Sequence, residues 1–378
     1  MRRSTSTRKD SSRATLSAPN DVSNGVQKSE KGALTLFYKL LKKQCVTVDL
    51  LPKQYKERYL SRGYRQPYSS FLDCLVSLFR LNNETLNVWT HLIPLILLLI
   101  YFYQTFPCEL WPLTKINPWY YPLLSEEISI LAYHLGSVIA HLFNCMTPRI
   151  RHICFFIDYA AISMFGMGGA CATYYYLRPL NTNILFFNMP NVYIGMASIA
   201  NVMAVYLCCA SRHKWEKSKY LIRTLAFALP YFAGNLPSYY RVLNCVFTGE
   251  ECTISLVILV VGSLGYLAAA ILNSTRFPEK HYRNIFDICG HSHQWVHIIT
   301  SFGTLAHILS VQTELQERAD KMETLLEGIT FYSSLGWVLG ALFVGVCVAL
   351  WFGSQLSVEG HLKNEHLHPD KNRSQYIK

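Results

Sequence analysis

The chain has 378 residues, of which 51% are hydrophobic and 16% charged, and its formal net charge is +11 at pH 7. Soluble domains carry about a quarter charged residues, so this composition excludes a single large soluble core. Nucleic-acid binding does not explain the positive charge, because the Lys and Arg flank long apolar runs instead of forming a basic face on a soluble fold. Basic residues in such positions are typical of membrane proteins, where they set topology and attract anionic lipid headgroups.

The chain begins with a Ser-rich, charged segment, residues 1–33, which contains no apolar run. It lacks the apolar stretch of about 7–15 residues that a secretory signal peptide needs, and we expect a disordered cytoplasmic tail. Residues 34–82 mix apolar and basic side chains, which predicts an amphipathic juxtamembrane region on the inner membrane surface. Within it, Ser69–Leu81 is expected to form a short helix that leads into the first span.

Eight mainly apolar runs follow, each close to the about 20 residues that a helix needs to cross the hydrocarbon core. They are Leu86–Phe106, Ile128–Met146, Cys154–Tyr176, Val192–Cys209, Tyr220–Tyr240, Cys252–Asn273, Trp295–Ser310 and Phe331–Phe352. The sequence therefore predicts an all-α polytopic membrane protein with a seven-transmembrane core over residues 83–311. Residues 312–353 are expected to form an acidic loop and an eighth transmembrane helix, before a cytoplasmic tail at 354–378. The fifth run is the weakest, because it contains Pro230 and Pro237.

The charges of the loops predict the orientation of the chain. The segments before the first run and after the second, fourth, sixth and eighth are basic, and basic loops mark the cytoplasmic side. Acidic residues fall on the other side, with Glu126 and Glu127 after the first run and Glu314 after the seventh. Both termini are therefore expected in the cytoplasm, which the even number of crossings also requires.

Two further patterns depend on this orientation. Three Asn-x-Ser/Thr sequons, at Asn83, Asn273 and Asn372, fall on the cytoplasmic side, where they should stay unmodified. Cys245 and Cys252 share one short loop on the opposite side. A disulfide between them is possible if that loop faces an oxidising compartment.

Several polar side chains lie inside the apolar runs, where ionisable groups are costly and are candidates for function. On the first helix, Glu84, Asn87 and His91 fall on one face. On the second helix, Ser137 and His141 share a face because they are four residues apart.

Three more candidates lie at a matching depth. Asp158 is about one turn into the third helix, and His293 and His297 are one turn apart near the start of the seventh. With the predicted orientation, all of these residues lie near the cytoplasmic leaflet. Four separate placements at one depth indicate a site, because unrelated polar residues would scatter across both leaflets. His134, by contrast, is expected on a different face of the second helix from His141.

The histidines suggest a metal. Two histidines at i and i+4, with a third from another helix, form the pattern of a catalytic zinc site, which keeps its fourth position open. The three would be His141, His293 and His297, and Asp158 could orient a bound water or a ligand imidazole. A buried network of His, Ser and Asp hydrogen bonds without metal explains the same spacing, and the residues alone do not decide between the two.

The runs ETLNVWTHLIP, SVIAH followed by PRIRHICFFIDY, and FDICGHSHQWVHI resemble the progestin and adipoQ receptor family. The similarity extends from about Leu51 to Ser310 and is greatest to the membrane progestin receptor branch. It implies a Zn²⁺ cofactor held by His141, His293 and His297. In this resemblance, Asp158 and Ser137 match the family's aspartate and its serine on the second helix.

The resemblance also implies a function. It predicts a plasma-membrane receptor for a progestin-like steroid or a related lipid, with a G protein as a possible partner. The wider superfamily includes ceramidases, so the alternative is a zinc-dependent lipid amide hydrolase acting on a sphingolipid-like molecule, with Asp158 and Ser137 as its catalytic residues. An apolar cavity among seven helices suits a sterol, and the candidate polar contacts to such a ligand are Glu84, Asn87, His91 and Gln294.

Overall fold

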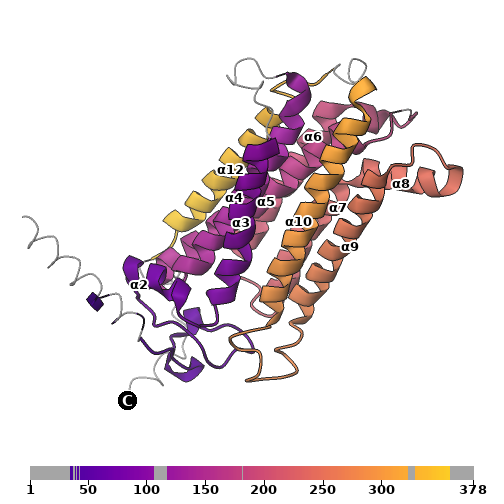
Figure 1. Cartoon of the computed structure of the whole chain (residues 1–378). Helices are drawn as coiled ribbons and strands as arrows, with labels where there is room; N and C mark the ends of the chain where they lie inside the picture. The colour runs from indigo at the N-terminus through magenta and orange to yellow at the C-terminus, as the bar shows by residue number, and fades with distance from the viewer. Residues whose placement is uncertain are drawn as a thin grey trace, which may run out of the picture. The chain divides into compact units, whose positions relative to one another are not determined.

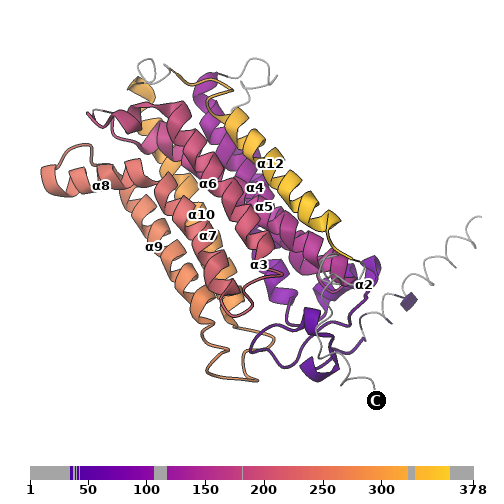
Figure 2. The same cartoon turned by 180° about the vertical axis from the view of Figure 1, so that it is seen from behind.

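The computed structural model describes residues 35, 36, 39, 41, 43–105, 117–180, 182–321 and 328–357. The chain divides into two compact units, residues 1–43 and residues 44–378. The second unit is a bundle of long helices (Figures 1 and 2), and the only strand-like pairing among the described residues is an isolated bridge between Val46 and Tyr64. The predicted all-α fold is confirmed.

The helices of the bundle follow one another in chain order with short connections. They are α2 (Phe71–Val76), α3 (Thr85–Thr105), α4 (Tyr121–Phe143), α5 (Pro148–Ala172), α6 (Pro190–Ala210), α7 (Lys219–Gly234), α8 (Leu236–Thr248), α9 (Ile254–Thr275), α10 (Ser292–Glu317) and α12 (Leu335–Ser354). A π-helical turn, Thr173–Leu177, extends α5. Short 3₁₀ turns lie at Val48–Leu50, Lys53–Tyr55, Ser77–Phe79, Pro118–Tyr120, Leu185–Asn188 and Ala319–Lys321.

Each of the eight predicted spans corresponds to a helix of this bundle. Within the described part of the chain, six helices are long and apolar enough to cross a membrane: α3, α4 with its preceding turn, α5 with its π turn, α6, α9 and α12. The other two predicted spans correspond to α7, which ends after 16 residues, and to α10, whose 26 residues carry many polar side chains. The chain is a multi-pass membrane protein, and the count of eight crossings stays a prediction.

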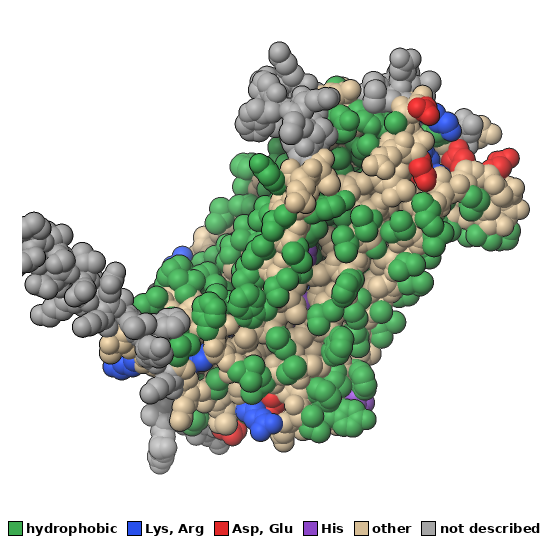
Figure 3. Space-filling view, viewed as in Figure 1, with side chains coloured by type: hydrophobic (Ala, Val, Ile, Leu, Met, Phe, Trp, Pro, Cys, Tyr) green, Lys and Arg blue, Asp and Glu red, His purple; other side chains and the backbone are tan. Residues whose placement is uncertain are grey.

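Apolar side chains cover the outside of the bundle between its two ends. In Figure 3, hydrophobic side chains dominate the middle of the visible face, and acidic and basic side chains gather mainly toward the ends. Exposed residues such as Leu97 on α3, Val261 on α9 and Phe343 on α12 are typical of lipid-facing surface. Buried polar residues instead lie inside the bundle, which reverses the distribution found in a soluble protein.

The fifth predicted span is broken. Helix α7 ends at Gly234, Asn235 caps it, and α8 begins at Leu236 with Pro237 in its first turn. Proline has no N–H and disfavours helical geometry in the residue before it, so the continuous helix stops here and a new one starts. The sequence identified this run as the weakest, and the structure shows where it breaks.

Two loop assignments were wrong. Helix α4 begins at Tyr121, so Glu126 and Glu127 lie inside it and are 0% and 6% exposed. Helix α10 runs on to Glu317, which leaves Glu314 fully buried. Glu126 and Glu314 are accommodated inside these helices because His307 contacts the first and Arg241 and Arg318 contact the second, and hydropathy alone cannot register such partners.

The start of α3 and the end of α12 lie at the same end of the bundle (Figures 1 and 2). A Cβ placed on Gly353, near the end of α12, would lie 3.5 Å from Ile153 near the start of α5. A disulfide joins Cys245, in the last turn of α8, to Cys252 in the connection before α9, and α8 lies toward the opposite end of the bundle (Figure 1). Disulfides persist in oxidising compartments, and the orientation with both termini in the cytoplasm stays a prediction.

We expect no N-glycan on Asn83 or Asn273. Asn83 is 3% exposed, and the side-chain amide of Asn273 donates to Thr224 Oγ1 at 2.7 Å, so neither nitrogen is free for a sugar. Asn372 lies outside the described residues. The check is a glycosidase-sensitive mass shift in expressing cells. The control is Val246→Asn, which creates a sequon with Thr248 on α8, where residue 246 is 71% exposed and should become glycosylated. A shift in the wild-type protein that Asn83→Gln removes would overturn the orientation.

Candidate metal centre

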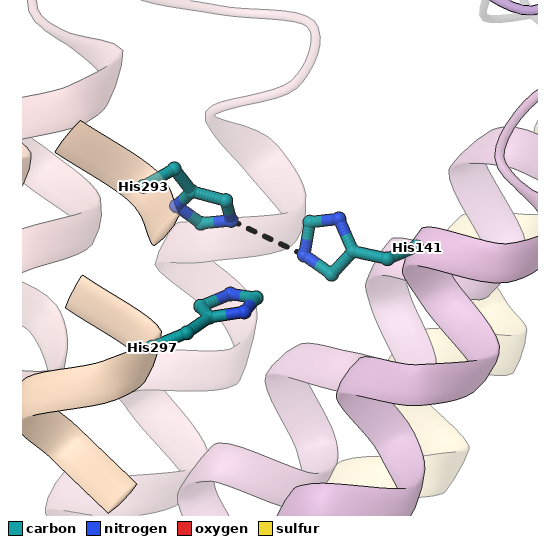
Figure 4. A group of neighbouring side chains, drawn as sticks. All are labelled: His141, His293 and His297. Carbon is teal, nitrogen blue, oxygen red and sulfur yellow. Dashed lines mark hydrogen bonds between the residues drawn. The ribbon is translucent and has the colours of Figure 1, made fainter. Parts of the chain in front are cut away.

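Three histidine side chains converge between α4 and α10. Figure 4 shows His141 from α4 facing His293 and His297, which extend from successive turns of α10. One ring nitrogen from each lies within 4.8 Å of the others, and the Nε2 atoms of His141 and His293 are 3.1 Å apart. Tetrahedral zinc with Zn–N bonds of about 2.0–2.1 Å sets its ligand nitrogens about 3.3 Å apart. The three side chains therefore fit a tetrahedral metal with a fourth position left open.

The Nδ1 atoms of His141 and His297 contact protein groups outside the cluster. His141 Nδ1 lies 2.8 Å from Glu84 Oε2, so an N–H there donates to the carboxylate. His297 Nδ1 lies 3.1 Å from the carbonyl oxygen of Asn87 and 3.2 Å from Thr90 Oγ1. These contacts leave the Nε2 atoms of both histidines to face the centre. A carboxylate behind a ligand histidine is the usual arrangement at zinc sites, because it fixes the ring and raises its basicity.

Glu84 is itself fixed by neighbouring amides. Its carboxylate accepts from Asn144 Nδ2 at 2.8 Å and from Asn87 Nδ2 at 2.7 Å, besides its contact with His141. The sequence assigned Glu84 and Asn87 to a ligand. Their side chains line the same cavity as the histidines, but their hydrogen bonds serve the orientation of His141.

The juxtamembrane region closes the end of α4 beside the site. Arg65, which is 6% exposed, donates to the carbonyl oxygens of His141 and Leu142 at 2.6 and 2.7 Å, and to Asn144 Oδ1 at 2.9 Å. A cation that satisfies the last carbonyls of a helix stabilises its C-terminus. Residues 44–64 form 3₁₀ turns and pack on this end, with Tyr55 donating to the Met146 carbonyl oxygen at 2.6 Å. This region therefore supports the site directly.

A cavity of about 290 Å³ opens beside the three histidines. This volume is close to the lower end of the about 300–1,000 Å³ found for small-molecule pockets. Its polar wall includes His91, Ser137 and Asp158, and its apolar wall includes Ile162, Phe165 and Phe227. The cavity thus combines an apolar body with a small set of polar groups, as binding sites for lipid-like molecules do.

Asp158 has a buried carboxylate oxygen that accepts no hydrogen bond from the described residues. The residue is 8% exposed, and its Oδ1 has no hydrogen-bond partner among the described residues. Buried polar atoms without a partner are rare, and each one needs an explanation such as a water, an ion or a ligand. Asp158 and the three histidines line the same cavity, so a metal-bound water or a bound ligand would supply the missing donor.

The structure brings together most of the residues singled out in the sequence. Glu84, Asn87, His91, Ser137 and Asp158 all line the cavity beside the histidines, as their common depth predicts. Gln294 does not line it. Its side chain accepts from the N–H of Gly290 at 2.6 Å and donates to the carbonyl oxygen of Ile288 at 2.8 Å, so it holds the loop before α10.

The assignment of His134 to a different face was wrong. His134 is fully buried, and its Nδ1 lies 2.9 Å from His91 Nδ1, while the His91 ring lies 4.1 Å from the His297 ring between centroids. Seven residues separate His134 from His141, which is about two turns, so both project toward the same side of α4. The histidines therefore form a longer buried group than the sequence analysis recognised.

A polar file along α10 was also missed. Beyond His297, Thr300 contacts the Tyr133 hydroxyl at 2.9 Å, and Thr304 contacts the Tyr266 hydroxyl at 3.1 Å. His307 follows and bonds Glu126. The file ends at Glu314, which accepts from Arg241 at 2.7 Å and from Arg318 at 2.5 Å. The alternating spacing of three and four residues could have shown this face in the sequence.

Comparison with known proteins identifies relatives for most of the chain. A family model described as haemolysin-III related matches residues 79–308, a range that includes all three histidines and Asp158. Membrane progestin receptor gamma-A of Danio rerio is 30% identical over 85% of this chain and 97% of its own length. Membrane progestin receptor delta of Mus musculus is 32% identical over 84% and 92%. Membrane progestin receptor beta of Homo sapiens is 27% identical over 71% and 76%.

Proposed function

The chain belongs to the haemolysin-III-related family, also called the progestin and adipoQ receptor family, and we propose that it is a membrane receptor for a progestin-like steroid or a related lipid. The observation that carries this proposal is the cavity of about 290 Å³ beside the three histidines. Relatives named as progestin receptors align with most of the chain. A steroid is rigid and apolar with one or two oxygens, so it needs an apolar wall and few polar contacts.

The residues of the cavity fit this role. Ile162, Phe165 and Phe227 supply apolar surface, while His91 and Asp158 line the wall without a full set of partners. The Nε2 atom of His91 and Oδ1 of Asp158 are both buried and unpaired among the described residues. A steroid carbonyl would accept from His91 Nε2, and a steroid hydroxyl would donate to Asp158 Oδ1, which is how a polar site selects one oxygen pattern over another.

Zinc is the metal that His141, His293 and His297 are proposed to hold, because three imidazoles with an open position suit it. Bound there, zinc would supply a Lewis acid and lower the pKa of a coordinated water. Glu84 would fix the His141 ring through its contact at 2.8 Å. Arg65 would hold the end of α4 that carries this histidine.

The unpaired Asp158 oxygen favours a second candidate, a zinc-dependent hydrolase of lipid amides. A carboxylate in this position can accept a proton from an attacking water and return it to the leaving amine. Ser137, which is 2% exposed and lines the cavity, would be a further polar group at the reaction centre. In this candidate the same cavity would bind the lipid chains of a ceramide-like substrate.

The proposal is tested by saturation binding of labelled progesterone to the purified chain in phosphatidylcholine nanodiscs. We expect saturable binding that Ala228→Trp reduces at least about tenfold, because residue 228 lines the cavity and a tryptophan there fills it. The matched control is Ala233→Trp, on an exposed position of the same helix, which should bind as the wild type does. An absence of saturable progesterone binding, or equal loss in both variants, would contradict the proposal.

A further inference from the structure

Two arginines that line the cavity have no ion-pair partner among the described residues. Arg212, from the α6–α7 connection, and Arg223, from the second turn of α7, both line the cavity. Arg276, at the end of α9, lines it as well, but its Nε lies 3.2 Å from Glu279 Oε1. Arg212 and Arg223 form no ion pair with any residue that the structure describes.

The contacts of these two arginines are with neutral or aromatic groups. Arg212 Nε donates to His152 Nδ1 at 2.9 Å, and its guanidinium lies 4.3 Å from the ring centroid of Phe155. Arg223 Nε donates to Ser211 Oγ at 2.7 Å. Each guanidinium offers five N–H donors, so both keep donors that these contacts do not use.

The nearby carboxylates among the described residues form no ion pair with Arg212 or Arg223. Glu57 lines the same cavity, but its Oε1 lies 2.5 Å from Arg151 Nη2. Burial alone would raise the pKa of Glu57, and the charges of Arg151 and Lys219 hold it below its ordinary value. Glu84 and Asp158 also line the cavity. Glu84 bonds His141, Asn87 and Asn144, and Asp158 forms no ion pair with either arginine, although Arg212 is near enough to act on its charge.

Burial lowers the pKa of the Arg212 guanidinium, and the positive charges of Arg223 and Arg151 lower it further. An arginine nevertheless stays protonated in a protein. Both side chains are half-buried, and a partly desolvated cation without an ion-pair partner is costly, so this part of the wall is suited to an anion. The planar guanidinium matches the oxygen spacing of phosphate and sulfate groups in particular.

We propose that the cavity binds an acidic amphiphile, a sulfate or phosphate monoester whose oxyanion lies between Arg212 and Arg223. Its apolar body would extend from that end along Phe227 and Ile162 toward Phe165. This inference rests on the proposed function, because it names the class of lipid that the same cavity takes. It adds a subsite for charge, which a neutral steroid would leave empty.

The test compares two ligands that differ only in the charged group, pregnenolone and pregnenolone sulfate, on the purified chain in phosphatidylcholine nanodiscs. We expect the sulfate to bind at least about tenfold more tightly, the smallest gain expected from a charge-assisted hydrogen bond. This ratio is measured on the wild-type protein, so the test stands even if a variant fails to fold. Equal affinity for the two ligands would overturn the inference.

Variants locate the effect. Arg212→Gln and Arg223→Gln should each remove most of the preference for the sulfate, measured as the ratio of the affinities for the two ligands in the same variant. Arg212→Lys should keep part of the preference, because it retains the charge but loses the fork of donors. The matched control is Lys214→Gln, an exposed cation two residues from Arg212, which should leave the ratio unchanged. A preference that survives both glutamine variants would contradict the assignment.

A second arm separates a ligand-borne oxyanion from a lipid headgroup. In nanodiscs that contain phosphatidylserine, the preference for the sulfate should persist. Its loss there would assign the arginines to an anionic lipid headgroup and overturn the acidic ligand. Binding of pregnenolone without a gain from the sulfate would overturn this inference and leave the proposed function standing. An absence of binding by either ligand would overturn both.

Discussion

Replacing His293 with alanine should remove the metal from the protein. The wild-type chain is expected to hold about one zinc, because three imidazole nitrogens lie within 4.8 Å of one another. His293→Ala leaves two ligands, and zinc content should fall below about a tenth of that value. The measurement is elemental analysis of the purified protein, together with its thermal unfolding with and without a chelator.

The metal should also stabilise the bundle, because a ligand that binds only the folded state raises stability by about 4 kcal/mol at a thousand times its dissociation constant. A chelator should therefore lower the unfolding temperature of the wild type and leave that of His293→Ala unchanged. Glu84→Gln should weaken zinc affinity by about 10–100-fold, because it removes the carboxylate that orients His141.

The matched control is His281→Ala, since residue 281 is exposed in the loop before α10 and contributes nothing to the centre. It should keep about one zinc and the full response to chelator. A wild-type protein that is free of zinc and insensitive to chelator would instead favour a hydrogen-bond network of histidines and Asp158.

Asp158→Asn should separate a receptor from a hydrolase. The substitution conserves the size of the side chain and removes its charge and its ability to take a proton. A receptor needs only a shaped cavity and a response to the ligand, so we expect progesterone affinity within about twofold of wild type. A hydrolase needs the carboxylate for proton transfer, and cleavage should fall by about 100-fold or more.

The assay therefore measures progesterone binding, release of sphingosine from ceramide and zinc content on the same preparations. Zinc content serves as the control, because it should stay at about one per chain if Asp158 does not ligate the metal. If the wild type binds no progestin and releases sphingosine in a zinc-dependent way, the receptor proposal fails and the hydrolase becomes the better account. If Asp158→Asn loses progestin binding while it keeps its zinc, Asp158 contacts the ligand directly.

Much of this protein could be predicted from its sequence. The positions of the long helices follow from hydropathy, because a segment that faces lipid must be apolar over the thickness of the bilayer. The common depth of Glu84, His141, Asp158, His293 and His297 follows from helix length and the direction of each helix. The three histidines and the aspartate were found in this way, and the cavity brings all of them together.

The tertiary structure decided which atoms these side chains contact. Glu84 serves His141, and Gln294 holds a loop, although sequence position made both candidates for a ligand. The direction of a side chain around its helix axis depends on how neighbouring helices are rotated and spaced. The rotation of one helix relative to its neighbours cannot be predicted from a single sequence.

The same reason explains the buried charges. Glu126 and Glu314 look like loop residues in a hydropathy profile, since a lone carboxylate inside a span is costly. They are buried because His307 on α10 contacts the first, while Arg241 on α8 and Arg318 at the end of α10 itself contact the second. The local sequence thus determined where this chain can enter a membrane. The packing of its helices determined that Glu126 and Glu314 could be buried inside, because it brings His307 and Arg241 near enough to offset the cost.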